Sequence, residues 1–150
     1  MERDTLIIAC SANKKEKPHL PFDLYLGQIY KLIRANTENI HDQFHVYILS
    51  AKYGLIDCDI HGEIAPYDSA ITKETLDEFV IKNGEVIAEQ FKALQGEKIT
   101  IVLPKMYLKA LELSLALNDL TLKDFALVDM PVKPRGIGDH QAFLKRKLNA

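Results

Sequence analysis

The sequence has few of the features that mark disulfide-bonded, metal-binding or secreted proteins. Its 150 residues include only two cysteines, with no CxxC pair and no cysteine–histidine spacing typical of a zinc site. This scarcity predicts neither a disulfide framework nor a metal, and it fits a reducing cytoplasm. The apolar stretch 5–10 is too short for the core of a signal peptide, and Glu2 and Asp4 precede it. We therefore predict a cytoplasmic protein that needs no cofactor.

Long apolar runs and a strong net charge are also missing. No run approaches the roughly 20 apolar residues that span a bilayer, so no membrane partner is predicted. The formal net charge of -2 gives no global electrostatic reason to bind nucleic acid, and such a site would have to be a local basic patch. The hydrophobic content of 47% is enough for the core of one domain, which we assign to residues 1–150.

Strand-like and helix-like apolar patterns alternate along the chain. The strand-like runs are 5–10, 44–50, 98–103 and 125–130, and helical spacing covers 23–36, 72–95, about 108–118 and 139–148. A kink or break is expected at Asn83-Gly84 in the second of these helices. The order βαβαβαβα predicts a single α/β domain with a mostly parallel four-stranded sheet flanked by helices. The strand order within the sheet is not predicted.

The predicted strand ends carry polar residues. The carboxyl ends of parallel strands share one edge, where open α/β sheets bind ligands. The residues delivered there are Cys10, Ser11, Asn13, Lys14 and Lys15, then Ser50, Lys52 and Tyr53, then Lys105 and Tyr107, and finally Lys133, Arg135, Gly136 and Gly138. A basic edge in an acidic protein favours an anionic ligand, such as a phosphate, a nucleotide or a nucleic-acid backbone. The alternative is that these lysines are only solvated loop residues.

Two strand ends have further signals for an anion site. After the apolar run 44–49, Gly54 allows a sharp turn or a positive φ, and we expect Lys52 to hold an anionic group beside it. Near the C-terminus, Gly136 and Gly138 precede a helix, where backbone N–H groups can approach an anion, and Arg135 lies next to them. An ordinary strand-to-loop junction and plain turn glycines are the alternatives.

Cys10 is the candidate nucleophile. A thiol at a strand end, close to Lys14 and Lys15, experiences a positive potential that favours the thiolate. The competing interpretation is a small buried hydrophobic residue. Cys58 is flanked by Asp57 and Asp59, whose negative charge disfavours its thiolate, so we predict that Cys58 is inert.

Several motifs resemble a bacterial and phage family of unknown function that is similar to the peroxide-stress protein YaaA. They are Cys10-x-x-x-Lys14, Asp23-Leu24-Tyr25, the segment from Leu49 to Leu55, Pro66-Tyr67-Asp68 and Gly136-Ile137-Gly138. The match covers nearly the whole chain, and the YaaA family is associated with DNA binding and protection under oxidative stress. A more distant similarity, limited to Cys10 and Lys14, is to a domain of archaeosine synthase, an enzyme of tRNA base modification.

The resemblance implies a nucleotide- or nucleic-acid-related site. Together with the strand ends it gives two sets of candidates: Cys10, Lys14, Ser50 and Asp68 as catalytic residues, and Asn13, Tyr25, Lys52, Tyr53, Gly54, Tyr67, Arg135, Gly136 and Gly138 as ligand-binding residues. One interpretation is a small enzyme acting on a nucleotide, nucleobase or modified nucleic acid. The other is a non-catalytic DNA- or RNA-binding protein of the YaaA-like stress-response type. The mixture of a thiol, a carboxylate, tyrosines and lysines favours the enzyme.

Overall fold

The protein contains one five-stranded sheet with strand order β3-β2-β1-β4-β5. The computed structural model describes residues 3–131 and 137–150. The strands are β1 (Asp4–Ala9), β2 (Phe44–Ser50), β3 (Gly54–Asp57), β4 (Ile99–Val102) and β5 (Val128–Asp129). Strand β1 pairs in parallel with both β2 and β4, and β4 pairs in parallel with β5. Only β3 is antiparallel to its neighbour, β2.

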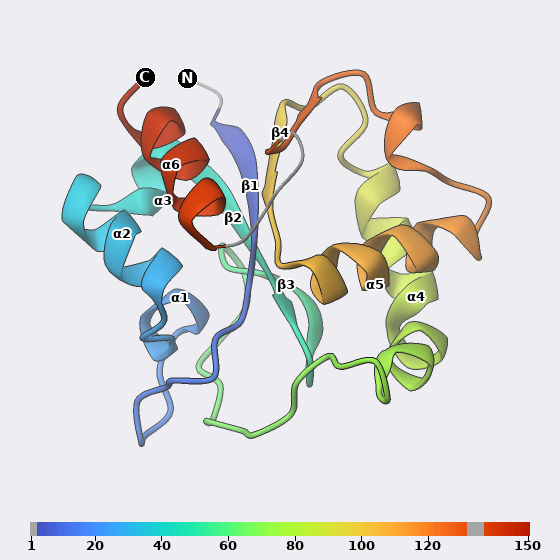
Figure 1. Cartoon of the computed structure of the whole chain (residues 1–150), viewed down its shortest axis with the longest axis horizontal. Coiled ribbons are helices and arrows are strands. Elements are labelled where there is room, and N and C mark those ends of the chain that lie inside the picture. Colours follow the sequence, from blue (N-terminus) through green and yellow to red (C-terminus); the bar gives the residue numbers. More distant parts are fainter. Residues whose placement is uncertain (1–2, 132–136) are drawn as a thin grey trace.

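Helices cover both faces of the sheet. They are α1 (Pro21–Leu24), α2 (Gln28–Asn36), α3 (Ile40–Gln43), α4 (Leu76–Lys92), α5 (Lys105–Ala116) and α6 (Ile137–Leu148), with a 3-10 turn, η1 (Leu122–Asp124). Helices α1, α2, α3 and α6 lie on one side of the sheet, and α4 and α5 lie on the other (Figure 1). Successive residues of β1 alternate between the two cores, since Leu6 and Ile8 pack in the first and Ile7 in the second. The domain is therefore a three-layer α/β/α sandwich.

The α/β class is confirmed, and the number of strands is corrected from four to five. The additional strand, β3, lies in the connection between the predicted strand 44–50 and the predicted helix 72–95. Gly54 has φ of 75° and pairs with Ser50, so the chain reverses at once and returns along β2. This reversal buries Leu55 and Ile56 against the cores. The last strand is shorter than the predicted run 125–130, because only Val128–Asp129 pairs with β4.

The predicted helix at 23–36 is divided into α1 and α2. Tyr25 has extended backbone angles (φ -88°, ψ 140°) and forms an isolated antiparallel bridge with Lys14. This pairing takes precedence over helical continuity, because it buries the Tyr25 ring completely. The break therefore draws the loop after β1 against the segment between the two helices.

The kink expected at Asn83-Gly84 is absent, because α4 is continuous from Leu76 to Lys92. A Cβ atom added at Gly84 would lie 3.5 Å from the Cα atom of Ser114 in α5. The glycine therefore marks a close approach of two helices. Among the described helices, none is long and apolar enough to cross a membrane.

The strand order creates a topological switch point between β1 and β4. The connection after β1 leads through α1, α2 and α3 to β2 on one side, while β4 lies on the other side of β1. Connections on opposite faces leave a crevice at the carboxyl ends of two such strands, which is where α/β proteins of this kind bind ligands. In this chain that crevice lies beyond Ala9 and Val102.

Candidate functional site

A cleft of about 840 Å³ lies at the switch point between β1 and β4. One wall comes from the loop after β1 and the start of α2, including Cys10, Ser11 and Gly27, and the other comes from the start of α5. Its floor and sides are mainly apolar, with Ile29 and Leu108 on opposite walls. The cleft is of the size that proteins use for small ligands, and its position is the one expected from the topology.

The polar groups of the cleft are mostly basic. Lys105 and Lys109 come from successive turns of α5, are exposed, and form no ion pair with any described residue. Glu112, one turn further along, adds a carboxylate. His140 of α6 closes the cleft on another side, and burial lowers the pKa of its imidazole. The neutral imidazole can donate one hydrogen bond and accept another.

The wall made by Ser11 and Gly27 is tightly fitted. The backbone N–H of Gly27 donates a hydrogen bond to the Ser11 hydroxyl over 3.1 Å, and that hydroxyl donates to the carbonyl of Asn13 over 2.8 Å. A Cβ atom at Gly27 would lie only 2.6 Å from the Cβ of Ser11. Only glycine fits here, and it brings the start of α2 up to the end of β1.

Cys10 lies between the cleft and a cluster of buried hydroxyl groups. Its backbone N–H donates to the carbonyl of Leu49 over 3.0 Å, which fixes it beside β2. Its Sγ atom is 3.4 Å from the hydroxyl oxygen of Tyr107, on α5. Burial, and then the negative charge that a Cys10 thiolate carries, raise the pKa of Tyr67 and of Tyr107. Both phenols therefore remain protonated at neutral pH.

Tyr67 links the end of β2 to the segment between α1 and α2 through hydrogen bonds. Its hydroxyl is 2.6 Å from the Ser50 Oγ and 2.7 Å from the Tyr25 hydroxyl, and all three residues are buried. The Ser50 Oγ also accepts the backbone N–H groups of Lys52 and Tyr53, over 3.3 Å and 3.1 Å. The loop 66–68 is thus attached to the end of β2.

Lys14 completes this cluster. Its ammonium lies 4.4 Å from the centre of the Tyr67 ring and 5.9 Å from that of Tyr25, distances at which a cation is attracted to an aromatic face. It also lies 3.4 Å from the carbonyl of Ala12. Five of the predicted residues therefore lie within one group: Cys10, Lys14, Tyr25, Ser50 and Tyr67.

Other predicted residues lie outside this group. The Lys52 ammonium is over the ring of its neighbour Tyr53, at 5.3 Å, and both side chains are exposed. Asp68 is exposed, and its side chain makes no hydrogen bond or ion pair with the described residues. Asn13 contributes its carbonyl to the wall of the cleft. Gly54 serves the hairpin turn between β2 and β3.

The predictions near the C-terminus are only partly covered by the structure. Arg135 and Gly136 lie outside the described residues. Gly138 is in the first turn of α6, where nothing lies within 4 Å of an added Cβ atom. Two residues later in the same helix, His140 lines the cleft.

Several residues of the cleft were not among the site candidates. Lys105 and Tyr107 were recognised as strand-end residues but were given no role, and Lys109 and His140 were not considered. The available signal was Pro104, which ends a strand and is followed by the pattern Lys-x-Tyr-x-Lys. At the beginning of a helix, this spacing supplies residues to both the cleft and the hydroxyl cluster.

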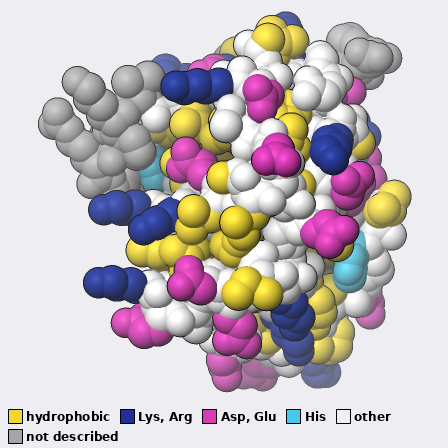
Figure 2. All heavy atoms as spheres, turned by 90° about the vertical axis from the view of Figure 1, so that its right-hand side faces the viewer, with side chains coloured by type: hydrophobic (Ala, Val, Ile, Leu, Met, Phe, Trp, Pro, Cys, Tyr) yellow, Lys and Arg dark blue, Asp and Glu magenta, His cyan; other side chains and the backbone are white. Residues whose placement is uncertain are grey.

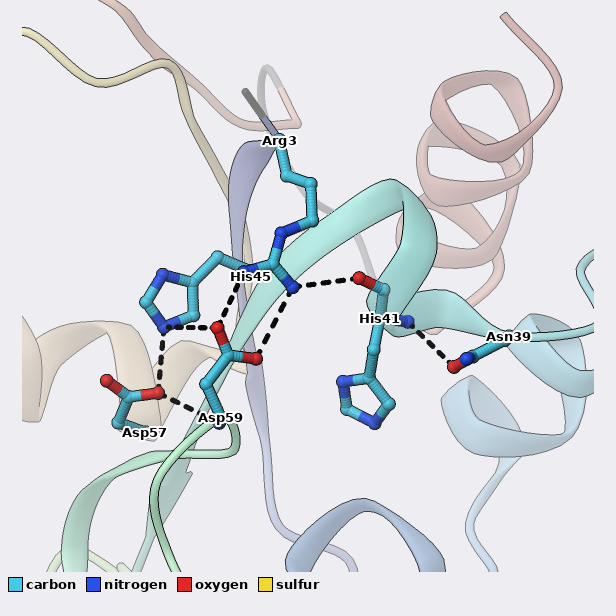
Figure 3. Close-up of polar contacts among 6 residues, drawn as sticks. All are labelled: Arg3, Asn39, His41, His45, Asp57 and Asp59. Carbon is cyan, nitrogen blue, oxygen red and sulfur yellow. Dashed lines mark hydrogen bonds and ion pairs between the residues drawn. The ribbon is translucent and has the colours of Figure 1, made fainter. Parts of the chain in front are cut away.

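A second polar cluster lies at the opposite end of the strands, near the starts of β1 and β2 (Figure 3). His45, in β2, is 2.7 Å from Asp57 and 3.6 Å from Asp59. Ligand atoms of these three residues lie within 4.8 Å of one another. However, Arg3 already pairs with Asp59 at 2.6 Å, and its guanidinium lowers the pKa of that carboxyl. The cluster is a closed set of ion pairs and hydrogen bonds.

The two cysteines should differ in reactivity. Burial, together with Asp57 and Asp59, raises the pKa of the Cys58 thiol well above its usual range, so little thiolate forms there at neutral pH. We expect iodoacetamide at pH 7.5 to label Cys10 about tenfold faster or more, as measured by peptide mass spectrometry. Serine variants of each cysteine identify the labelled peptide. Equal, slow labelling of both would make Cys10 a structural core residue.

The comparisons with known proteins identify a family and no individual relative. Residues 5–146 match a family model described as "Family of unknown function (DUF6884)". No curated protein and no solved structure matches the chain. None of these findings connects the chain with YaaA or with archaeosine synthase.

Proposed function

We propose that this chain, which belongs to the family of unknown function DUF6884, is a small enzyme acting on a nucleotide, nucleobase or modified nucleic acid. Its ligand would occupy the cleft at the carboxyl ends of β1 and β4, with Cys10 as the reactive group. The observation that carries the proposal is the position of Cys10, which lines the cleft and also touches the Tyr107 hydroxyl.

The composition of the cleft supports a ligand with a planar apolar part and an anionic part. The apolar walls around Ile29 and Leu108 suit a base ring. The ammonium groups of Lys105 and Lys109, which form no ion pair with a described residue, suit a phosphate. Helices α2 and α5 also begin at the cleft, so the positive ends of their dipoles favour negative charge there. A nucleotide combines both parts in one molecule.

The chemical groups around Cys10 favour catalysis over simple binding. A surface that only holds nucleic acid needs basic and stacking side chains, whereas this site contains a thiol and buried hydroxyls. The outer face of α4 and α5 carries intermixed acidic and basic side chains (Figure 2), which does not favour a nucleic-acid backbone there. Non-catalytic DNA or RNA binding of the YaaA-like type is the competing outcome of the tests below.

Two of the motifs that resemble the YaaA-like family lie in contact with each other. Its two most specific motifs are the segment from Leu49 to Leu55 and Pro66-Tyr67-Asp68. They meet at the 2.6 Å hydrogen bond between Ser50 and Tyr67. A shared site at this contact is part of the proposal.

A variant of Lys105 tests the proposal that the cleft binds the phosphate of a nucleotide. We expect one or more members of a nucleoside mono-, di- and triphosphate panel to bind the parent protein in calorimetric titrations. The change Lys105→Met should weaken that binding about tenfold, because an ionic hydrogen bond of about 1.5 kcal/mol is lost. The matched control is Lys98→Met, which removes an exposed lysine just before β4, at the opposite end of that strand.

The same titrations with single-stranded and duplex oligonucleotides separate the two functions. Tight, sequence-independent binding of oligonucleotides with a strong salt dependence, combined with no binding of mononucleotides, would support the non-catalytic protein. Equal loss of affinity in Lys98→Met and Lys105→Met would show that the lysines act only through the overall charge.

A further inference from the structure

The hydrogen bonds around Tyr107 leave its hydroxyl proton available to the Cys10 sulfur. The backbone N–H of Ile71 donates to the Tyr107 hydroxyl oxygen over 3.3 Å. The phenolic proton therefore remains for the other close partner, the Cys10 Sγ at 3.4 Å. A sulfur atom accepts such a bond far better as a thiolate than as a thiol, because hydrogen bonds to charged acceptors are the stronger ones.

The chain of hydroxyls from Ser50 to Tyr25 has a direction as well. The Ser50 Oγ accepts two backbone N–H groups, which use its two lone pairs, so its own proton goes to Tyr67. Tyr67 then donates to Tyr25 over 2.7 Å. Burial, and with it a negative charge at Cys10, raises the pKa of Tyr25, so the Tyr25 hydroxyl lies within electrostatic reach of the sulfur.

We infer that Tyr107, supported by the Ser50–Tyr67–Tyr25 hydroxyl chain, is a positioning residue that stabilises the Cys10 sulfur as a thiolate facing the cleft. This inference deepens the proposed function, on which its biological meaning rests. It gives the buried hydroxyls a role in stabilising a thiolate, which a surface that only binds nucleic acid would not need. Tyr107 acts directly on the sulfur, whereas the buried hydroxyls of Ser50, Tyr67 and Tyr25 make no hydrogen bond with it and act on it only electrostatically.

Other charged and titratable groups also surround Cys10. On the hydroxyl side, the Lys14 ammonium lies over the Tyr67 ring and adds a positive charge. The groups that line the cleft with Cys10 are Lys105, Lys109, Glu112 and His140. The lysines are present in the parent protein and in every variant discussed here, and they favour the thiolate equally in all of them. A difference in Cys10 reactivity between a variant and the parent therefore reports the lost hydroxyl.

The test is the pH profile of Cys10 alkylation in the ligand-free full chain. The rate of carbamidomethylation by iodoacetamide is measured from pH 6 to pH 10 by peptide mass spectrometry. In Tyr107→Phe, the midpoint of this profile should move up by about one pH unit, since an ionic hydrogen bond of about 1.5 kcal/mol is lost. Ser50→Ala, which removes the first donor of the chain, should move it in the same direction by less.

Tyr47→Phe is the matched control, because it removes a tyrosine hydroxyl in the middle of β2 and should leave the profile unchanged. An unchanged profile in Tyr107→Phe would overturn the inference. The parent protein supplies an independent measurement, because its alkylation rate should level off below about pH 8.5, the range of an ordinary thiol. A parent rate that still rises through pH 9 would overturn the inference even if a variant fails to fold. No nucleotide is used, so failure here and failure of the proposed function are distinguishable.

Discussion

Replacing Tyr67 with alanine is expected to lower the free energy of unfolding by about 4 kcal/mol, the range for deleting a large buried aromatic side chain. Tyr67 is 8% exposed, and its ring packs edge-on against those of Tyr25 and Tyr53, with centroids 6.4 Å and 5.6 Å away. The substitution leaves a cavity and also deprives the Ser50 and Tyr25 hydroxyls of their shared partner. Urea denaturation followed by circular dichroism measures the change.

Phenylalanine at position 67 separates the ring from its hydroxyl. Tyr67→Phe keeps the packing and removes two hydrogen bonds in a buried site, so we expect a loss of about 1–2 kcal/mol. Tyr53→Phe is the control, because the Tyr53 side-chain hydroxyl makes no hydrogen bond with a described residue. Its removal should leave the free energy of unfolding almost unchanged. Equal stability of Tyr67→Phe and the parent would mean that the hydroxyl network does not hold the loop 66–68 on β2.

Gly27→Ala is expected to cost about 2–3 kcal/mol, in the range of overpacking a fitted contact. The added Cβ would lie 2.6 Å from the Cβ of Ser11, which is attached directly to the backbone after β1 and cannot swing away. The clash should separate α2 from the end of β1 and break the hydrogen bond from Gly27 to Ser11. Thermal or urea unfolding reports the loss, and Gly62→Ala, with open space around it, is the control.

A double variant tests the cause of this loss. Ser11→Gly removes the atoms that the new methyl group strikes, at the cost of the Ser11 hydrogen bonds. The pair Ser11→Gly with Gly27→Ala should therefore be more stable than Gly27→Ala alone, a non-additivity that directly contacting residues show. Additive losses would place the effect in the cap of α2 and not in the contact with Ser11.

The part of the fold that could be predicted from the sequence is the part encoded by long apolar periodicities. The strands β1, β2 and β4 and the helices α4, α5 and α6 are near their predicted positions, because each buries a continuous apolar run or face. Strand β3 was missed because its four residues give too short a signal and because Gly54 was interpreted only as a turn. Asn83-Gly84 suggested a kink because a contact between α4 and α5 cannot be read from local sequence.

The site could be predicted where its residues follow strands. Cys10 and Ser50 directly follow or end neighbouring strands, so a parallel arrangement was enough to bring them to one edge. Tyr67 and Tyr25 came from motifs, and their contact with each other depends on tertiary packing of two irregular segments. Lys52 lies apart from this group, because its place in a hairpin turn puts its ammonium over the Tyr53 ring. The residues of α5 could not be placed in the cleft from the sequence, because locating the switch point needs the strand order, which apolar periodicity does not contain.

Protection of Cys10 by a bound nucleotide tests the account most directly, because Cys10 lines the cleft where the ligand should lie. The measurement is the rate of Cys10 alkylation at pH 7.5 in rising concentrations of each nucleotide and nucleobase of the panel, with the iodoacetamide concentration held constant. The account predicts that at least one of these ligands slows labelling of Cys10 in a saturable way, with a midpoint equal to its calorimetric dissociation constant, and that Lys105→Met moves this midpoint up about tenfold. Labelling of Cys10 that proceeds at the same rate in the presence of every nucleotide, nucleobase and oligonucleotide would contradict it.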